Sequence, residues 1–351
     1  MTTASGLGIG GELRRLCDGT LGWLGRHLDH FDPFTADRPA PGPAGRESGG
    51  AHRPAKAALE LALLTHCWTR LDAGADPRRA EATARVRAIW RHPGLPRLLA
   101  ADPRAAAQYR LACAALAPTG TDDAPFRADL ARLTPADLSP AGRSPYQRLE
   151  LRYYADKAGV AHSVEPYADL AERNVLVELP ATALARAARR DRRRPDAARP
   201  DVARSAAGRP AAGPDEPPVT VPEAYALTHS SFYLSDFART GPGLPEGAVA
   251  DAAALVARLL DHCVRHDWWD LAAELVMTQV CLGLDAPGTP EGAAAVECLA
   301  RAQRPDGSVP GRSAATRAGA ADPPAGYFAK AYHTTLVTAL MTLLLGAEGA
   351  A

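Results

Sequence analysis

Apolar residues recur along this chain at the spacing of an α-helix. Between residues 55 and 72, Leu59, Leu63, Cys67 and Leu71 stand at four-residue intervals. Side chains four residues apart lie on the same face of a helix, so this segment is predicted to be helical with one buried side. Similar patterns predict further helices over residues 10–31, 78–91, 104–117, 145–158, 166–178, 181–190, 222–239, 247–265, 268–283, 290–304 and 329–346.

The composition agrees with an all-α fold class. Hydrophobic residues make up 46 % of the chain, enough for a sizeable core, and Ala and Leu dominate them. Both are good helix formers, whereas the residues typical of strands are few. Only residues 174–179 read as a strand, and they can equally form a buried helix. About eleven or twelve antiparallel helices usually form a bundle, an open solenoid or a closed ring.

Two segments rich in Pro, Gly and charge interrupt the helical pattern. We expect residues 32–54 to form a mobile loop and residues 188–220 a disordered linker, because neither can bury enough apolar surface to offset its ordering entropy. The linker would separate an N-terminal helical part, residues 1–187, from a C-terminal part, residues 221–351. Both parts are expected to complete one ring.

Charge and motifs exclude several classes of protein. Forty basic and forty acidic residues cancel, so the chain lacks the positive footprint of a general nucleic-acid binder. No apolar run reaches the roughly 18 residues of a membrane span, and the N-terminus does not read as a secretory signal. Six scattered cysteines suit reduced thiols, which predicts a cytoplasmic protein. Phosphate-cradling glycine motifs are absent, so no nucleotide or flavin cofactor is expected.

The segment from residue 225 to residue 237 contains the first candidate site. At 100° per residue, Tyr225, His229, Tyr233 and Asp236 share one helical face. Asp236 or Tyr233 could orient the imidazole of His229 and make it a general base. We therefore predict His229, Tyr233 and Asp236 as catalytic, with Tyr225 and Phe232 binding substrate. The alternative is a buried polar network with a structural role.

Two more segments contain candidate residues. Asp270 lies one turn before Glu274, so the two could act as paired carboxylates, although Asp270 could equally cap a helix. His333 is expected at a helix N-terminus, where the dipole would keep it neutral and available as a base, and it is predicted to be catalytic. Trp269, Asp270 and Tyr332 are predicted to bind substrate. A metal site would require His229, His333 and an acid to converge, and none is predicted.

The C-terminal motifs resemble one repeat of the α/α-toroid enzymes. Gln303 to Ser308 match the Gln-x-x-Asp-Gly-Ser of class II terpene cyclases, with Val309 in place of the following Trp. A glycine-rich loop before Tyr332-His333-Thr334 is similar to the β subunits of protein prenyltransferases, in which the His binds zinc. The resemblance implies a closed ring of paired helices. The acid motif of the cyclases, the Asp and Cys of the zinc site and the Cys motifs of lanthionine cyclases are all missing.

The chain also resembles an uncharacterised family of helical actinomycete proteins. The resemblance rests on Trp23-Leu24, on Asp32-Pro33-Phe34 and on the Thr-His-x-x-Phe-Tyr-Leu-x-Asp-Phe segment that begins at Thr228. Such proteins accompany gene sets for specialised, often peptide-derived, metabolites. This implies a biosynthetic enzyme that performs acid/base or cyclisation-type chemistry on an apolar or peptide substrate in a ring cavity. The alternative is a non-catalytic scaffold that binds a peptide or a partner biosynthetic enzyme.

Overall fold

The protein is all-helical in a computed structural model that describes residues 4–35, 54–71, 74, 76–122, 124–193, 217–311 and 324–348. No strand occurs in these ranges, which confirms the predicted all-α class. Residues 36–53 and 194–216, most of the predicted loop and linker, lie outside the described residues.

The helices of the N-terminal part are α1 (Ala4–Arg26), α2 (Leu28–Phe31), α3 (Pro54–Leu71), α4 (Pro77–Arg91), α5 (Leu95–Leu99), α6 (Ala106–Ala115), α7 (Ala124–Leu130), α8 (Pro145–Ala158), α9 (Tyr167–Glu172) and α10 (Val175–Arg193). The C-terminal part contains α11 (Val221–Leu234), α12 (Ala248–His266), α13 (Trp269–Cys281), a short 3₁₀ turn η1 (Ala286–Gly288), α14 (Pro290–Ala302) and α16 (Pro324–Glu348). The strand-like run 174–179 lies almost wholly in α10.

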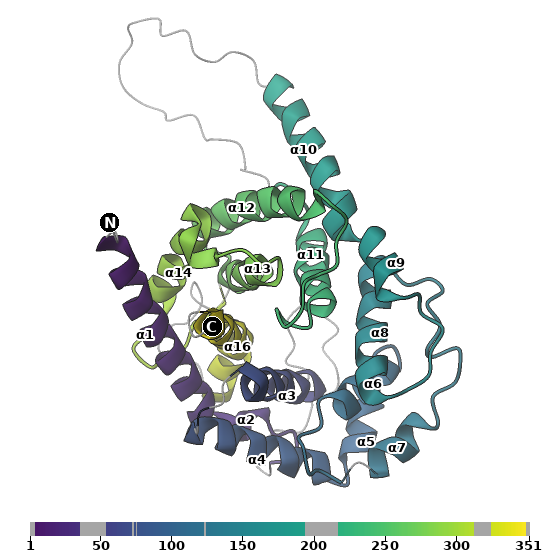
Figure 1. Cartoon of the computed structure of the whole chain (residues 1–351). Coiled ribbons are helices and arrows are strands. Elements are labelled where there is room, and N and C mark those ends of the chain that lie inside the picture. Colours follow the sequence, from purple (N-terminus) through teal and green to yellow (C-terminus); the bar gives the residue numbers. More distant parts are fainter. Residues whose placement is uncertain are drawn as a thin grey trace, which may run out of the picture.

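Six helices, which we call the central helices, each pack against at least two others of the set. Helix α3 contacts α6, α6 contacts α8, α8 contacts α11, α11 contacts α13, α13 contacts α16, and α16 contacts α3. Figure 1 shows α3, α11, α13 and α16 near the middle of the molecule, with α4, α12, α14 and α1 outside them. The N-terminal and C-terminal parts therefore share one core.

Local sequence explains where two of the central helices begin. Ser144 accepts a hydrogen bond from the backbone N–H of Gln147, whose side chain accepts one from the Ser144 N–H. Thr220 and Glu223 form the same reciprocal pair at the start of α11. A Pro follows in the first turn of each helix, where its missing N–H costs nothing. The two capped helices pack against each other.

Helices α13 and α16 are buried on nearly every side. All residues of α13 from Leu271 to Cys281 are buried. Within α16, the segment Gly326–Ala347 is long and apolar enough to cross a membrane by length and composition, but 78 % of it is buried inside the protein. Its packing against α1, α3 and α13 accounts for this apolar character.

The Gln-x-x-Asp-Gly-Ser motif forms the contact between the end of α14 and α1. Gln303 donates to the carbonyl of Leu16, and Asp306 accepts hydrogen bonds from the backbone and the hydroxyl of Ser308. Gly307 has a φ of +92°, and a Cβ there would lie 2.2 Å from the carbonyl oxygen of Gly19. In this protein the motif therefore has a packing role that only glycine permits at residue 307.

Candidate functional site

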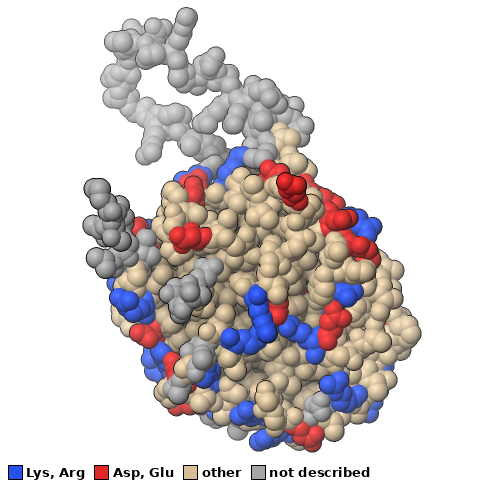
Figure 2. Space-filling view, in the orientation of Figure 1, with Lys and Arg blue, Asp and Glu red and all other residues tan. Residues whose placement is uncertain are grey.

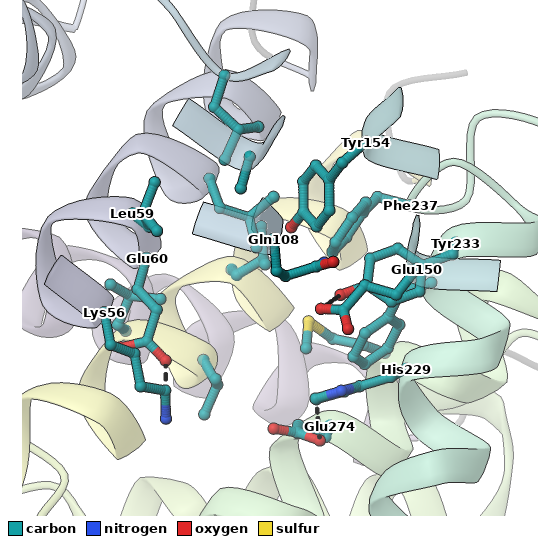
Figure 3. Close-up of a pocket in the computed structure, with 18 of the residues that line it drawn as sticks. Lys56, Leu59, Glu60, Gln108, Glu150, Tyr154, His229, Tyr233, Phe237 and Glu274 are labelled. Atoms are coloured by element: carbon teal, nitrogen blue, oxygen red, sulfur yellow. Dashed lines mark hydrogen bonds and ion pairs between the residues drawn. The ribbon is translucent and has the colours of Figure 1, made fainter. Parts of the chain in front are cut away.

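A cavity of about 220 Å³ lies among the central helices. Every helix of the six contributes to its wall, and Figure 3 shows its polar side chains. Most of the lining is apolar: Leu59, Leu63, Ala112, Leu116, Phe232, Phe237, Met277, Leu336, Val337 and Leu340. The polar lining comprises Lys56, Glu60, Gln108, Tyr109, Glu150, Tyr154, His229, Tyr233 and Glu274. An apolar pocket with a few convergent polar groups is typical of a small-molecule site.

Glu274 is the most unusual of these residues. It projects from α13, its side chain is only 3 % exposed, and Thr228 donates a hydrogen bond of 2.7 Å to its Oε2. Histidine nitrogens flank both carboxylate oxygens: His229 Nε2 lies 3.7 Å from Oε2, and His333 Nε2 lies 3.9 Å from Oε1. Burial raises the pKa of Glu274 to about 7, against the opposing charge of His333. This carboxyl group is thus balanced between its two protonation states near neutral pH.

His229, a predicted catalytic residue, lines the cavity. Its side chain is 33 % exposed. Burial lowers its pKa to about 4, and the charge of His333 adds to the effect. The rings of Tyr146 and Phe232 lie 5.7 and 5.9 Å from the imidazole ring. His229 is therefore a neutral imidazole in aromatic surroundings, as a general base or hydrogen-bond partner requires.

His333 behaves differently from the sequence-based expectation. Helix α16 begins at Pro324, so His333 lies within the helix and not at its N-terminus. Its Nδ1 lies 3.0 Å from Oε1 of Glu60, which also pairs with Nζ of Lys56 at 3.3 Å. Burial would lower the pKa of His333, but the charge of Glu60 and the hydrogen bond with it together outweigh burial and raise the pKa. The prediction that His333 lies at a helix N-terminus was wrong, and its nearest charged neighbour is a carboxylate and not a helix dipole.

The opposite wall of the cavity contains another carboxyl group. Tyr233, predicted to be catalytic, donates a 2.9 Å hydrogen bond to Glu150 on α8. Burial raises the pKa of Glu150 despite this bond. Figure 3 places Gln108 and Tyr154 beside this pair. Tyr233 is therefore at the cavity, but its partner is Glu150 and not His229.

Asp236 does not orient His229. Helix α11 ends at Leu234, and Asp236 has a φ of +50°, so the helical face extrapolated from the sequence stops short of it. Its carboxylate instead accepts hydrogen bonds from Arg70 and Tyr153 and pairs with Lys157 at 2.9 Å. These partners overcome burial and lower its pKa to about 2. The residue is absent from the lining of the cavity.

The predicted substrate-binding residues divide into two groups. Phe232 lines the cavity, whereas Tyr225, Trp269, Asp270 and Tyr332 are not part of its lining. Tyr225 donates a 2.6 Å hydrogen bond to Asp270 in the first turn of α13. Trp269 and Tyr332 pack against the core, and the ring of Tyr332 stacks on that of Phe328. Asp270 is thus one turn from Glu274 but points to a different partner.

Sequence reasoning missed Glu60 and Glu150 and ranked Asp270 above Glu274. These three glutamates share a local signal, because each lies inside a helix between two small or apolar neighbours: Leu59 and Leu61, Leu149 and Leu151, Ala273 and Leu275. A charged side chain inside an apolar helical segment is expected to be paired or functional if it is buried, since burying it unpaired is costly.

The arrangement can hold and move protons. Among the described residues, the histidine nitrogen next to Oε1 of Glu274 is Nε2 of His333, at 3.9 Å, which is too far for a hydrogen bond. This oxygen is therefore available to a ligand in the cavity. In the same ranges, no three His, Cys, Asp or Glu side chains are placed to hold a metal ion.

A family model matches residues 17–343, and its description is a domain of unknown function, DUF6895. Because the match covers most of the chain, the protein belongs to this family. Neither a curated protein nor a solved structure matches it.

Proposed function

We propose that this member of the DUF6895 family is an enzyme in which Glu274 acts as a general acid and base on an apolar or peptide-derived substrate. The observation that carries the proposal is a buried carboxyl group with a pKa of about 7, flanked by two histidines in a largely apolar cavity. A group with a pKa near the working pH is the most effective at proton transfer. Perturbed carboxyl groups cluster at functional sites for this reason.

The proposed chemistry is one proton transfer and its reversal. Protonated Glu274 gives its proton to a substrate atom, and His333, whose pKa is raised by Glu60, favours the carboxylate that forms. The neutral imidazole of His229 and the Tyr233–Glu150 pair bind polar groups of the substrate, while the apolar wall excludes water and strengthens these interactions. Acid/base or cyclisation-type reactions need this combination of a proton donor and an apolar chamber.

The fold that we propose is an α/α toroid. The six central helices contact one another in a closed order, and α1, α4, α12 and α14 lie outside them in Figure 1. An inner ring with an outer layer is the architecture of the toroid enzymes that the C-terminal motifs resemble. The position of the cavity, with all six central helices in its wall, supports the same assignment.

A substitution at Glu274 tests the proposal in the natural host. A strain that lacks the gene is complemented with the wild-type protein or with Glu274→Gln, and metabolites are compared by mass spectrometry. We expect Glu274→Gln to lose the product and accumulate its precursor, because the amide cannot release a proton, while the melting temperature stays within a few degrees of the wild type. Asp261→Asn, which removes an exposed carboxylate on α12, is the control and should retain the product.

The alternative function is a scaffold that binds a peptide or a partner biosynthetic enzyme. It is favoured by the apolar half of the cavity wall, because apolar side chains can bind a ligand but take no part in proton transfer. If Glu274→Gln restores the full metabolite profile, proton transfer by Glu274 is excluded. Loss of the product after Phe232→Ala alone would then support binding without catalysis.

A further inference from the structure

A second cavity, of about 280 Å³, adjoins the first. It lies where α3 and α11 end, and its lining consists of Cys67, Arg70, Leu71, Phe237 and Arg239. Phe237 also lines the central cavity, so a single aromatic side chain forms a wall common to both. We call the second cavity the arginine cavity.

Positive charge exceeds negative charge at the arginine cavity. Arg70 and Lys157 both pair with Asp236, so one carboxylate faces two cations. Arg239 adds a third cation on the cavity wall, and it is exposed. Figure 2 shows basic side chains gathered near the middle of one face of the molecule. Together these four side chains leave an excess of two positive charges.

The surroundings of His66 show the same excess of positive charge. Arg70 Nη1 lies 3.1 Å from Nε2 of His66, a contact in which the imidazole must accept and therefore be neutral. Burial lowers the pKa of His66 to about 4, and the charges of Arg70, Lys157 and Arg239 lower it further than Asp236 raises it. A neutral histidine beside three cations is the expected response to positive potential.

The backbone between the cavities is fixed in an unfavourable conformation. Asp236, Phe237 and Ala238 have φ values of +50°, +56° and +63°, a left-handed run that non-glycine residues rarely adopt. Such strain persists where the surroundings enforce it, and it clusters at ligand sites. The hydrogen bonds of Asp236 to Arg70 and Tyr153 hold the run, together with a bond from the Ala238 N–H to Ser235.

We propose that the arginine cavity binds an anionic group, a carboxylate or a phosphate, of the ligand whose apolar part occupies the central cavity. Arg239 supplies an exposed guanidinium, and Arg70 and Lys157 supply a positive field that Asp236 only partly cancels. A planar guanidinium matches both anions through paired N–H donors. This proposal adds a substrate class, a ligand with an anionic group, to the proposed function. It rests on the proposed function only in assuming that one ligand spans both cavities.

Binding of simple amphiphiles tests this proposal without any turnover. Octanoate, octyl phosphate and octanol share an apolar chain and differ in charge, and their affinities are measured by titration calorimetry. We expect Arg239→Gln to weaken octanoate and octyl phosphate about tenfold, because one charge-assisted contact is lost, and to leave octanol unchanged. The stronger of the two anions identifies the headgroup.

Two further measurements sharpen the result. Arg301→Gln removes another exposed arginine, on α14, and should not alter any affinity. The pKa of His66, followed by NMR, should rise when octanoate neutralises the field. Equal octanoate affinity in the wild type and Arg239→Gln, or an unchanged pKa of His66, would overturn the proposal. These readouts are independent of Glu274, so an active Glu274→Gln variant would refute the catalytic role alone.

Discussion

Glu60, Glu150 and Glu274 all line the central cavity, but their pKa values are shifted differently because their partners differ. Glu60 pairs with Lys56 and His333, and these cations lower its pKa to about 2 although burial acts in the opposite direction. Glu274 has histidines only beyond hydrogen-bond distance, so burial dominates and raises its pKa to about 7. Residue type alone therefore does not identify the acid of such a site; the nearest cation does.

The pKa shifts of His229 and Glu274 make opposing contributions to stability. Glu274 titrates at about 7 in the folded protein and near 4.5 when unfolded, so it stabilises the fold below pH 4.5 and this contribution is lost as the pH rises to 7. His229 titrates at about 4 when folded and near 6.5 when unfolded, so its penalty is present at low pH and disappears as the pH rises. Between pH 4.5 and 6.5 the loss of stability from Glu274 and the gain from His229 partly cancel.

Single variants should separate the contributions of Glu274 and His229 to the pH dependence of the free energy of unfolding. Relative to the wild type, Glu274→Gln should gain stability as the pH rises from 4.5 to 6.5, and His229→Gln should lose it, each by on the order of 1–3 kcal/mol. Urea denaturation at each pH gives the free energy of unfolding. Glu297→Gln, at a half-exposed position on α14, is the control and should follow the wild type. Parallel curves for all four proteins would show that neither residue has a shifted pKa.

At the scale of elements, the chain's own pattern predicted most helices. The Ser144 cap and Gly159, which has a φ of +66°, bound α8 at the predicted residues 145–158. Helices α3, α4, α12, α13 and α14 also lie within two residues of their predicted ranges. Short helices such as α5 were missed because five residues do not complete an apolar repeat.

The candidate site was harder to predict than the helices. The predicted helical face of α11 does not extend to Asp236, where the backbone is left-handed in place of another helical turn. Arg70 and Lys157, which are distant from Asp236 in sequence, pair with it and hold this conformation. The start of α16 at Pro324 likewise moved His333 away from a helix end. The first error arises from tertiary ion pairs, which no local pattern encodes. The second arises because α16 begins five residues before the predicted start at residue 329.

The loop after α14 allows a test of close packing. Gly307→Ala should lower the free energy of unfolding by about 1–3 kcal/mol or more, because it combines a positive φ with a clash against the backbone of Gly19. Gly120→Ala is the matched control, since its φ is +80° but a Cβ would meet no atom within 4 Å. Denaturation in urea should show a larger loss for Gly307→Ala. Equal losses would mean that the contact with α1 contributes nothing.

At the scale of the whole molecule, α16 connects the two parts of the chain. It packs against α1, α3 and α13, and its Leu336, Val337 and Leu340 line the cavity. A chain that ends at Gly311 should therefore lose its cooperative thermal transition, as measured by calorimetry. The control is the full chain, which should show a single cooperative transition under the same conditions. A near-normal transition in the shortened chain would show that α16 is dispensable.

The contact between α3 and α16 joins two segments that are synthesised at different times. Residues 54–71 leave the ribosome long before residues 324–348, by roughly 10–50 s at usual rates of translation. During that interval Glu60 is without His333, and the cavity lacks one of its walls. The chamber can therefore be completed only after translation reaches α16, and until then the nascent chain must keep its apolar faces away from other chains.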